Sequence, residues 1–231
     1  ANELLYLNKL DNDGDIIRFS KDGAEVGSIG SVAGVSTYIH GGTGYSGVTF
    51  GNDEILPCSE AGATRDAAID LGDASGRFKD LYLSGGVFLG GTGSANKLED
   101  YEEGTWTMGL TTTLGSPSFS ITNTTGTYTK IGNTVHVRIY TGAIVVNNAG
   151  SGTAYITGLP FTVSNSGGVD SNYSAASFAH TTIFSTTYEA YAAVGNTFAV
   201  VTQVGSINGA NFTTAGGHRY MMFTLTYKTD L

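Results

Sequence analysis

The run from Ala68 to Leu89, AIDLGDASGRFKDLYLSGGVFL, constrains the fold of this chain more than any other segment. Acidic turns, a Gly-Gly corner and short apolar pieces follow one another too quickly for the segment to form a core of its own. We therefore expect this run to be ordered only where other strands or other chains pack against it.

The composition predicts an all-β protein with many tight turns. The 231 residues include 34 glycines and only 3 prolines, and 13% of the residues are charged. A chain of this length forms one large β domain or two smaller ones. Its single cysteine, Cys58, has no partner for an intrachain disulfide, and we expect a buried, unreactive thiol.

Charge is distributed unevenly along the chain. Residues 1–100 hold 15 acidic and 7 basic side chains, whereas residues 101–231 hold 5 acidic and 4 basic ones. The net charge of −9 therefore arises almost entirely in the first part, and we place the junction near residues 99–104. Because no cluster of Lys and Arg is present that would neutralise phosphates, we expect no nucleic-acid binding.

The sequence also lacks the signals of membrane insertion and export. No window approaches the roughly 18 consecutive apolar residues of a membrane span. The start, ANELLYLNKLDND, lacks the order of basic, apolar and small residues that marks a signal peptide. We expect no membrane insertion, and we expect the sequence to begin inside a longer chain.

In the first part, short strand-like runs alternate with turn sequences. The runs are ELLYLN, DIIRFS, EVGSI, VTFG, LYLS and VFLG, and the turns include DNDG, KDG and GDASG. Asp13-Gly14 and Asp22-Gly23 suit turns that require positive φ. Between these turns, Ile17 and Phe19 are expected on one face of a strand and Arg18 on the other.

One hundred residues of this kind contain too few large apolar side chains for a single-chain core. Ordering the backbone costs about 1–2 kcal/mol per residue in entropy, which such a chain does not offset. Where several chains wrap around one axis, each short strand buries its apolar face against its copies, and sheet edges pair between chains. The residues alone therefore predict an assembly of more than one chain.

The second part alternates more clearly between apolar and polar residues. The stretch 127–140 has Gly132-Asn133 at its centre and predicts a hairpin that turns Val135, Val137 and Ile139 toward a core. With the remaining alternating stretches it predicts a sandwich of about eight strands. The core face of the last strand holds Met221, Phe223, Leu225 and Tyr227, and further strands are expected at residues 105–110, 153–156, 190–194 and 197–204.

Between the two parts, SANKLEDYEEG at residues 94–104 predicts a short helix. Ser94 or Asn96 is suited to cap it, Leu98 and Tyr101 are spaced for one helical face, and Gly104 is suited to end it. About ten residues are too few for a stable isolated helix, so we expect neighbouring chains to hold it.

Several segments resemble bacteriophage tail fibres and receptor-binding proteins. Three of them are DIIRFSKDGAEVGSIGS (15–31), LGDASGRFKDLYLSGGVFLGG (71–91) and TGSANKLEDYEEGTW (92–106). Two more, GTYTKIGNTVHV (126–137) and ITGLPF (156–161), are similar to the distal heads of such proteins.

The resemblance implies an architecture and a broad role. We expect a homotrimer with an intertwined β shaft over residues 1–93, a helical neck over 94–104 and a jelly-roll-like β-sandwich head over 105–231. The head is expected to bind a bacterial surface polysaccharide or outer-membrane protein. The rest of the phage tail is expected to join upstream, so the protein would lie at the tail-fibre tip of the virion after assembly in the host cytoplasm.

Candidate receptor-binding residues come from turn-rich loops and from aromatic side chains of the second part that could serve as binding platforms. The stretches 164–174 and 206–219 are long and rich in Gly, Ser and Asn, and TTYEAY at 186–191 places two tyrosines beside a glutamate. The candidates are Asn172, Tyr173, Tyr188, Glu189, Tyr191, His218 and Arg219.

Motifs for cofactors and metals are weak, and we expect neither. Gly42, Gly44 and Gly47 match the spacing G-x-G-x-x-G, but no helix or βαβ unit surrounds them. Asp11, Asp13 and Asp15 match the start of a calcium loop, but the sixth position is Ile16 and the twelfth is Asp22. The four histidines, at positions 40, 136, 180 and 218, are dispersed, although copies on a threefold axis can still hold an ion.

The sequence favours a binding protein over an enzyme, with two alternatives left open. The first is a polysaccharide depolymerase, which needs two carboxylates at a suitable separation; Asp170 and Glu189 are the candidates in the second part. The second is a purely structural fibre or capsid decoration. No G-x-S-x-G elbow is present, and the many Ser and Thr residues suit strand faces and turns.

Overall fold

The computed structural model describes residues 5–166, 172–185, 187–205, 208–213 and 218–230. The chain divides into two compact units, Ala1–Tyr82 and Leu83–Leu231, referred to below as the N-terminal and C-terminal units. Both are built from β-strands, so the all-β class expected from the composition is confirmed.

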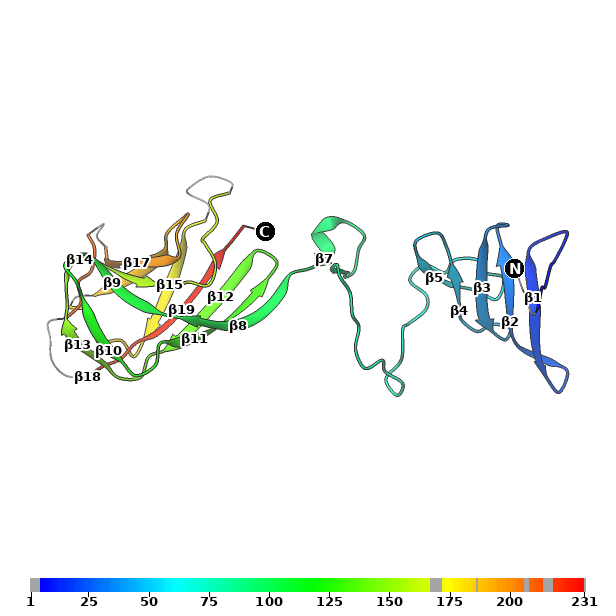
Figure 1. Ribbon diagram of the computed structural model, residues 1–231, viewed down its shortest axis with the longest axis horizontal. Coiled ribbons are helices and arrows are strands. Elements are labelled where there is room, and N and C mark those ends of the chain that lie inside the picture. Colours follow the sequence, from blue (N-terminus) through cyan, green and yellow to red (C-terminus); the bar gives the residue numbers. More distant parts are fainter. Residues whose placement is uncertain (1–4, 167–171, 186, 206–207, 214–217, 231) are drawn as a thin grey trace. The chain divides into compact units, whose positions relative to one another are not determined.

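The N-terminal unit contains one five-stranded antiparallel sheet in which neighbours in sequence are neighbours in space (Figure 1). The first turn is tight, with φ values of 51° at Asp22 and 83° at Gly23, and it pairs Lys21 with Ala24. The turn expected at Asp22-Gly23 is therefore confirmed. The strands are β1 (Gly14–Lys21), β2 (Ala24–Val32), β3 (Ser36–Gly41), β4 (Gly47–Phe50) and β5 (Ile55–Cys58).

The two faces of this sheet differ in character. One face carries polar side chains and is covered by the segment that follows β5, where Gly62 lies against the ring of Tyr38 and its carbonyl oxygen accepts a hydrogen bond from Thr49 at 3.1 Å. The opposite face carries an unbroken apolar row, one residue from each strand in register. The row consists of Ile17, Ile29, Ile39, Val48 and Pro57.

Burial of apolar side chains is concentrated in the C-terminal part of the chain. Within the described residues 5–98, only Tyr38 and Cys58 are buried hydrophobic residues, and 22 large hydrophobic side chains are exposed. From residue 101 onward, 24 hydrophobic residues are buried in the described part and seven large ones are exposed. The thiol of Cys58 is free and buried, as expected.

The helix expected over residues 94–104 is a wrong prediction. Only Ser94–Asn96 form a single 3₁₀ turn; Lys97–Leu98 form the short strand β7, which pairs with β6 (Val87–Phe88), and a long strand begins at Tyr101. From residue 101 onward, successive side chains point to opposite faces, as in a strand. This strand pairs with β11 of the C-terminal unit. In the described part of the chain, no helix has the length and apolar character needed to cross a membrane.

The C-terminal unit is dominated by a nine-stranded antiparallel sheet that curls into a half-barrel (Figure 1). Its strand order is β8-β11-β12-β19-β15-β16-β17-β14-β9. The strands are β8 (Tyr101–Thr107), β9 (Gly109–Leu114), β11 (Thr125–Ile131), β12 (Thr134–Tyr140), β14 (Ser151–Thr157), β15 (Ser174–Ala179), β16 (Tyr188–Ala192), β17 (Phe198–Gln203) and β19 (Met222–Lys228).

A second, three-stranded sheet contributes to the same core. It has the order β10-β13-β18, from β10 (Ser118–Ile121), β13 (Ile144–Asn148) and β18 (His218–Arg219). Its Ile144 and Val146 belong to the same buried cluster as residues of the large sheet. The unit therefore has more strands than the eight expected, because one broad curled sheet replaces two sheets of similar size.

The hairpin expected at residues 127–140 is confirmed. Ile131 pairs with Thr134 around Gly132, whose φ is 55°, and Val135, Val137 and Ile139 are buried. The expected core face of the last strand is confirmed as well. Its residues Met221, Phe223, Leu225 and Tyr227 are all at most 1% exposed.

Candidate functional site

The outward face of strands β8, β11, β12 and β19, which is the face opposite the core, carries two cross-strand rows of polar side chains. Antiparallel register places the members of each row on adjacent strands, about 5 Å apart. The first row consists of Glu103, Thr129, His136 and Thr226, and the second of Thr105, Thr127, Arg138 and Thr224.

Contacts within these rows fix the two nitrogen-bearing side chains. Nδ1 of His136 lies 2.9 Å from the hydroxyl of Thr226. The Nε of Arg138 donates a hydrogen bond to the hydroxyl of Thr127 at 3.1 Å. No carboxylate of the described residues lies within 4.0 Å of the Arg138 guanidinium, so its remaining donors face solvent.

Two hollows of the outward face meet at Arg138 and Thr127. The first has a volume of about 610 Å³ and extends over Glu103, Thr129 and His136. The second has a volume of about 520 Å³ and is bounded by Asn123, Tyr140, Met222 and Thr224 among others. Both are shallow depressions of a strand surface, which suits an elongated ligand better than a small enclosed one.

Three aromatic rings are stacked beside the second hollow. The ring of His180 lies between those of Tyr140 and Tyr220, with centroid separations of 6.1 and 4.8 Å and interplanar angles of 29° and 13°. His180 is exposed and has a φ of 45°, a conformation that costs a non-glycine residue about 1–3 kcal/mol. The stack holds Tyr140, which is 44% exposed, in a defined orientation at the edge of the hollow.

Of the residues expected to bind a receptor, Tyr173, Glu189 and Tyr191 share the outward face on the other half of the sheet. The rings of Tyr191 and Tyr173 pack edge to face, with their centroids 5.4 Å apart. Strand β16, which contains Tyr191, also turns Glu189 outward. Burial is the main cause that raises the pKa of Tyr191. Beyond it, Tyr155 packs on Phe198 at 4.7 Å, so this half of the face is more aromatic than the half that contains Arg138.

Two other expected residues have structural contacts. Tyr188 turns toward the core, where it packs against Phe178 and Phe184 and donates a hydrogen bond to the carbonyl oxygen of Thr181 at 2.8 Å. Asn172 is buried, and its amide donates hydrogen bonds to Ser164 and to the carbonyl oxygen of Ser166. Their arrangement suits support of the scaffold rather than direct contact with a ligand.

His218 and Arg219 form β18 in the three-stranded sheet, apart from the tyrosines. They pair with Val145 and Ile144 of β13. The Nε atom of Arg219 is buried and has no hydrogen-bond partner in the described part of the chain. The structure therefore does not join these two residues to the others in one site. Asp170 and parts of the stretches 164–174 and 206–219 lie outside the described residues.

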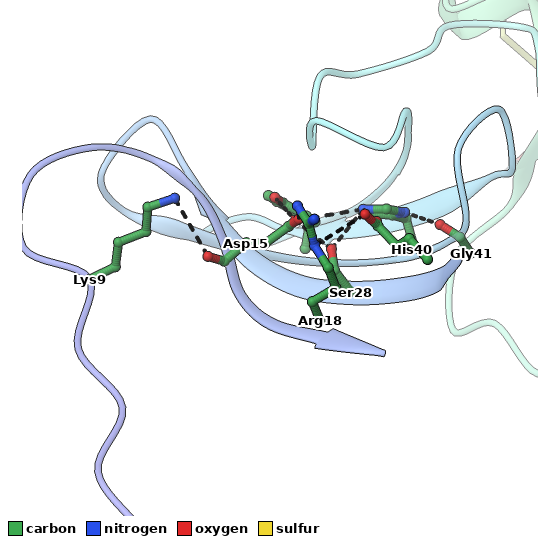
Figure 2. A network of polar contacts seen from close by, with 8 residues as sticks. Lys9, Asp15, Arg18, Ser28, His40 and Gly41 are labelled. Carbon is green, nitrogen blue, oxygen red and sulfur yellow. Dashed lines mark hydrogen bonds and ion pairs between the residues drawn. The ribbon is translucent and has the colours of Figure 1, made fainter. Parts of the chain in front are cut away.

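The N-terminal unit contains a polar network on the covered face of its sheet (Figure 2). Ser28 donates a hydrogen bond to Asp15 at 2.5 Å, and its oxygen lies 2.7 Å from Nε2 of His40. Tyr38 donates to the same carboxylate oxygen of Asp15 at 2.9 Å, and Arg18 donates to the other oxygen at 3.1 Å.

The residue types in this network match a Ser-His-Asp triad, but the connections do not. In a triad the carboxylate holds the histidine, and Nε2 accepts the proton of the serine. Here the serine proton points to Asp15, and Nδ1 of His40 faces the carbonyl oxygen of Gly41. Ser28 is also 1% exposed, so no substrate reaches its hydroxyl. We interpret the network as structural.

Hydrogen bonds and burial shift the pKa values of two groups in this network. The hydrogen bond from Ser28 is the main cause that lowers the pKa of Asp15 to about 2, with further contributions from Tyr38 and Arg18. Burial, followed by the hydrogen bond to Asp15, raises the pKa of Tyr38 to about 12. Among the described residues, no group of three or more His, Cys, Asp or Glu side chains is arranged to hold a metal ion.

The hydroxyl-rich outward face was not among the expected sites, although its signal is in the sequence. The stretches TYTK, TVHVRIY and TLTY alternate strictly, and their apolar half predicts the core. The polar half of the same alternation marks the outward face, but only the strand register shows which residues form a row.

Comparison with known proteins adds no assignment: no family model matches the chain, and no curated protein or solved structure is significantly similar to it.

Proposed function

We propose that this protein is the distal part of a homotrimeric bacteriophage tail fibre whose C-terminal unit binds a receptor on the bacterial surface without covalent chemistry. In this proposal residues 1–93 form the shaft, and the part of the C-terminal unit from residue 105 onward, which contains the nine-stranded sheet except for the start of β8, is the head. The trimer, the phage origin and a location at the tip of the virion fibre follow from the resemblance of the five segments quoted above.

The imbalance of apolar burial is the observation that carries the proposal. Residues 5–98 expose 22 large hydrophobic side chains in the described chain and bury two hydrophobic residues. At about 25 cal/mol per Å² of apolar surface, such exposure is a large unfavourable term for an isolated chain. Copies of the chain packed around one axis cover these side chains, and this is the arrangement expected of a fibre shaft.

The apolar row of the N-terminal sheet supports the same proposal. Ile39, at the centre of the row, is 43% exposed, and Val48 beside it is 38% exposed. The network of Asp15 and Ser28 lies on the covered face, so the usual distribution of polar and apolar side chains is reversed. An assembly in which the apolar row faces other chains removes this reversal.

The C-terminal unit has the properties required for adhesion. A rigid sheet with its own core presents hydroxyl, guanidinium and aromatic groups on an outward face, as sugar or protein recognition requires. Three copies on one shaft raise the effective concentration at a surface, so weak binding at each site gives firm attachment.

Two measurements test the proposal on the whole chain. Light scattering should give a mass of three chains of 23.9 kDa each. The labelled protein should bind susceptible bacteria and not receptor-deficient mutants of the same strain. A stable monomer would contradict the fibre, and equal binding to both strains would contradict receptor recognition. Release of new reducing sugar ends from host polysaccharide would show that adhesion is not the whole activity.

A further inference from the structure

We propose that the outward face around Arg138 binds an acidic glycan, with a sugar carboxylate on the guanidinium and a sugar ring on Tyr140. This inference rests on the proposed function, because it assigns a location and a ligand class to the receptor site. It concerns strands β8, β11, β12 and β19, which contain none of the candidate residues expected from the sequence.

The charge of this face distinguishes it from the rest of the chain. Its four strands turn the cations Arg138 and Lys228 outward, against the single carboxylate of Glu103. The whole chain has a net charge of −9. Glu103 accepts a hydrogen bond from Tyr101, and Lys228 donates to Asn133 and Thr134. Within the described residues, Arg138 is therefore the cation of this face that keeps donors for a ligand besides the Nε bonded to Thr127.

The guanidinium of Arg138 is positioned to accept a planar anion. Its Nε is fixed by Thr127, and Arg138 lines both hollows. Arginine pairs with carboxylates through two parallel hydrogen bonds, so a fixed guanidinium without an internal carboxylate partner is suited to bind one from outside.

Neighbouring groups match the remainder of a sugar. The hydroxyls of Thr127 and Thr224 flank Arg138 on adjacent strands, and both are donors and acceptors like the hydroxyls of a sugar ring. Tyr140 lies two residues further along β12, about 7 Å from Arg138, and its ring is held by the stack with His180 and Tyr220. A fixed, half-exposed ring offers an apolar platform with little entropy to lose.

The extent of the face suits a polymer. From His136 to Tyr140 the strand spans about 13 Å, so a ligand along β12 passes over both hollows. Strands β14, β16 and β17, which carry Tyr155, Tyr191 and Phe198 of the aromatic cluster, contain no Lys or Arg, which is why we assign the acidic ligand to the half of the face that contains Arg138.

Glycan binding by the full chain tests the inference. The probes are polygalacturonate, a polysialic acid, a phosphomannan and neutral dextran, immobilised at equal density. We expect binding to at least one of the two carboxylated polymers and none to dextran. Binding to the phosphomannan alone would show that the ligand group is a phosphate and not a carboxylate, and would overturn the proposal. Binding to dextran, or to none of the probes, would overturn it as well.

Variants locate the site. Arg138→Gln should weaken binding at least tenfold, Arg138→Lys should restore only part of it, and Tyr140→Ala should weaken it several-fold. Lys79→Gln, which removes an equally charged side chain of 94% exposure in the N-terminal unit, is the matched control and should bind normally. Wild-type binding by Arg138→Gln, with an unchanged circular dichroism spectrum, would overturn the proposal.

Failure of this inference is distinguishable from failure of the proposed function. If Arg138→Gln still attaches to susceptible bacteria as the wild-type chain does, the receptor site lies elsewhere and adhesion stands. If the wild-type chain does not attach to bacteria at all, adhesion itself is contradicted.

Discussion

Lys130 forms an ion pair with Asp100, although the lysine side chain is only 6% exposed and the aspartate side chain is 46% exposed. The lysine Nζ also lies 5.5 Å from the centre of the Phe161 ring. The pair joins β11 to the residue just before β8, which is an edge strand of the nine-stranded sheet. The buried ammonium depends on a carboxylate that reaches it from the surface.

Removal of the Asp100 carboxylate should therefore destabilise the C-terminal unit. We expect Asp100→Asn to lower the free energy of unfolding by about 1–3 kcal/mol, less than for a fully buried pair because Asp100 is half exposed. Urea unfolding followed by the fluorescence of Trp106, the only tryptophan, reports on this unit.

Glu99→Gln is the control for this prediction, because the Glu99 carboxylate lies in the same unit, is 42% exposed and pairs with Lys97, whose side chain is 32% exposed. Its effect should stay within about 0.5 kcal/mol. If Lys130→Met also removes most of the effect of Asp100→Asn in the double variant, the pair is responsible. Equal stability of Asp100→Asn and Glu99→Gln would show that the buried ammonium does not need its partner.

Acid should destabilise the N-terminal unit through Asp15. The pKa of this carboxyl is lowered to about 2 in the folded chain, chiefly by the hydrogen bond from Ser28. A lowered pKa contributes stability that is present above the unfolded value near 4 and is lost as the pH falls toward 2. We expect a loss of about 1–2 kcal/mol over this window.

Hydrogen exchange of peptides from residues 14–58, measured at pH 5 and at pH 2.5 after correction for intrinsic rates, should show this loss. Asp15→Asn has no carboxyl to protonate at this position. The variant should be less stable than the wild-type chain at pH 5, and its stability should change less between pH 5 and pH 2.5. The hypothesis would be abandoned if the wild-type chain and Asp15→Asn responded to acid equally.

Gly30 should be intolerant of a side chain. A Cβ atom at this position would contact the ring of Tyr38 and the carbonyl oxygen of Gly14, and Tyr38 is fully buried and bonded to Asp15. We expect Gly30→Ala to destabilise the N-terminal unit by about 2 kcal/mol, as overpacked sites do. Gly76→Ala in the same unit, where the added atom would meet only a carboxylate oxygen of Asp73 at the ordinary distance of 3.5 Å, should have a much smaller effect in the same hydrogen-exchange measurement.

Local alternation of side chains was sufficient to predict some elements and not others. The hairpin around Gly132 and the core face of β19 were predicted from the alternation of apolar and polar residues, and the structure keeps that alternation. The error at residues 94–104 arose because Leu98 and Tyr101 also suit a helical face. The register of β8 with β11, from Tyr101 opposite Ile131 to Thr107 opposite Thr125, decides for the strand, and this pairing is not local.

The candidate site residues were also predicted only in part. Turn-rich loops and tyrosines in the sequence predicted Tyr173 and Tyr191, whose rings do meet, but also Tyr188 and Asn172, which pack inside. Composition cannot distinguish these cases, because the direction of each side chain depends on the strand to which it belongs. The rows around Arg138 require residues from four strands in register, and no short stretch of sequence contains them.

The apolar row of the N-terminal sheet allows a direct test of the proposed assembly. Ile39 lies at the centre of the row and is 43% exposed. A lysine at this position would place a charge where copies of the chain are proposed to meet, so Ile39→Lys should reduce the mass in solution toward that of one chain. Val35, in the turn before β3, is 88% exposed, and Val35→Lys adds the same charge outside the row. Sedimentation velocity should show the wild-type mass for Val35→Lys and a smaller mass for Ile39→Lys. If both variants kept the wild-type mass, the row would not be the surface that joins the chains.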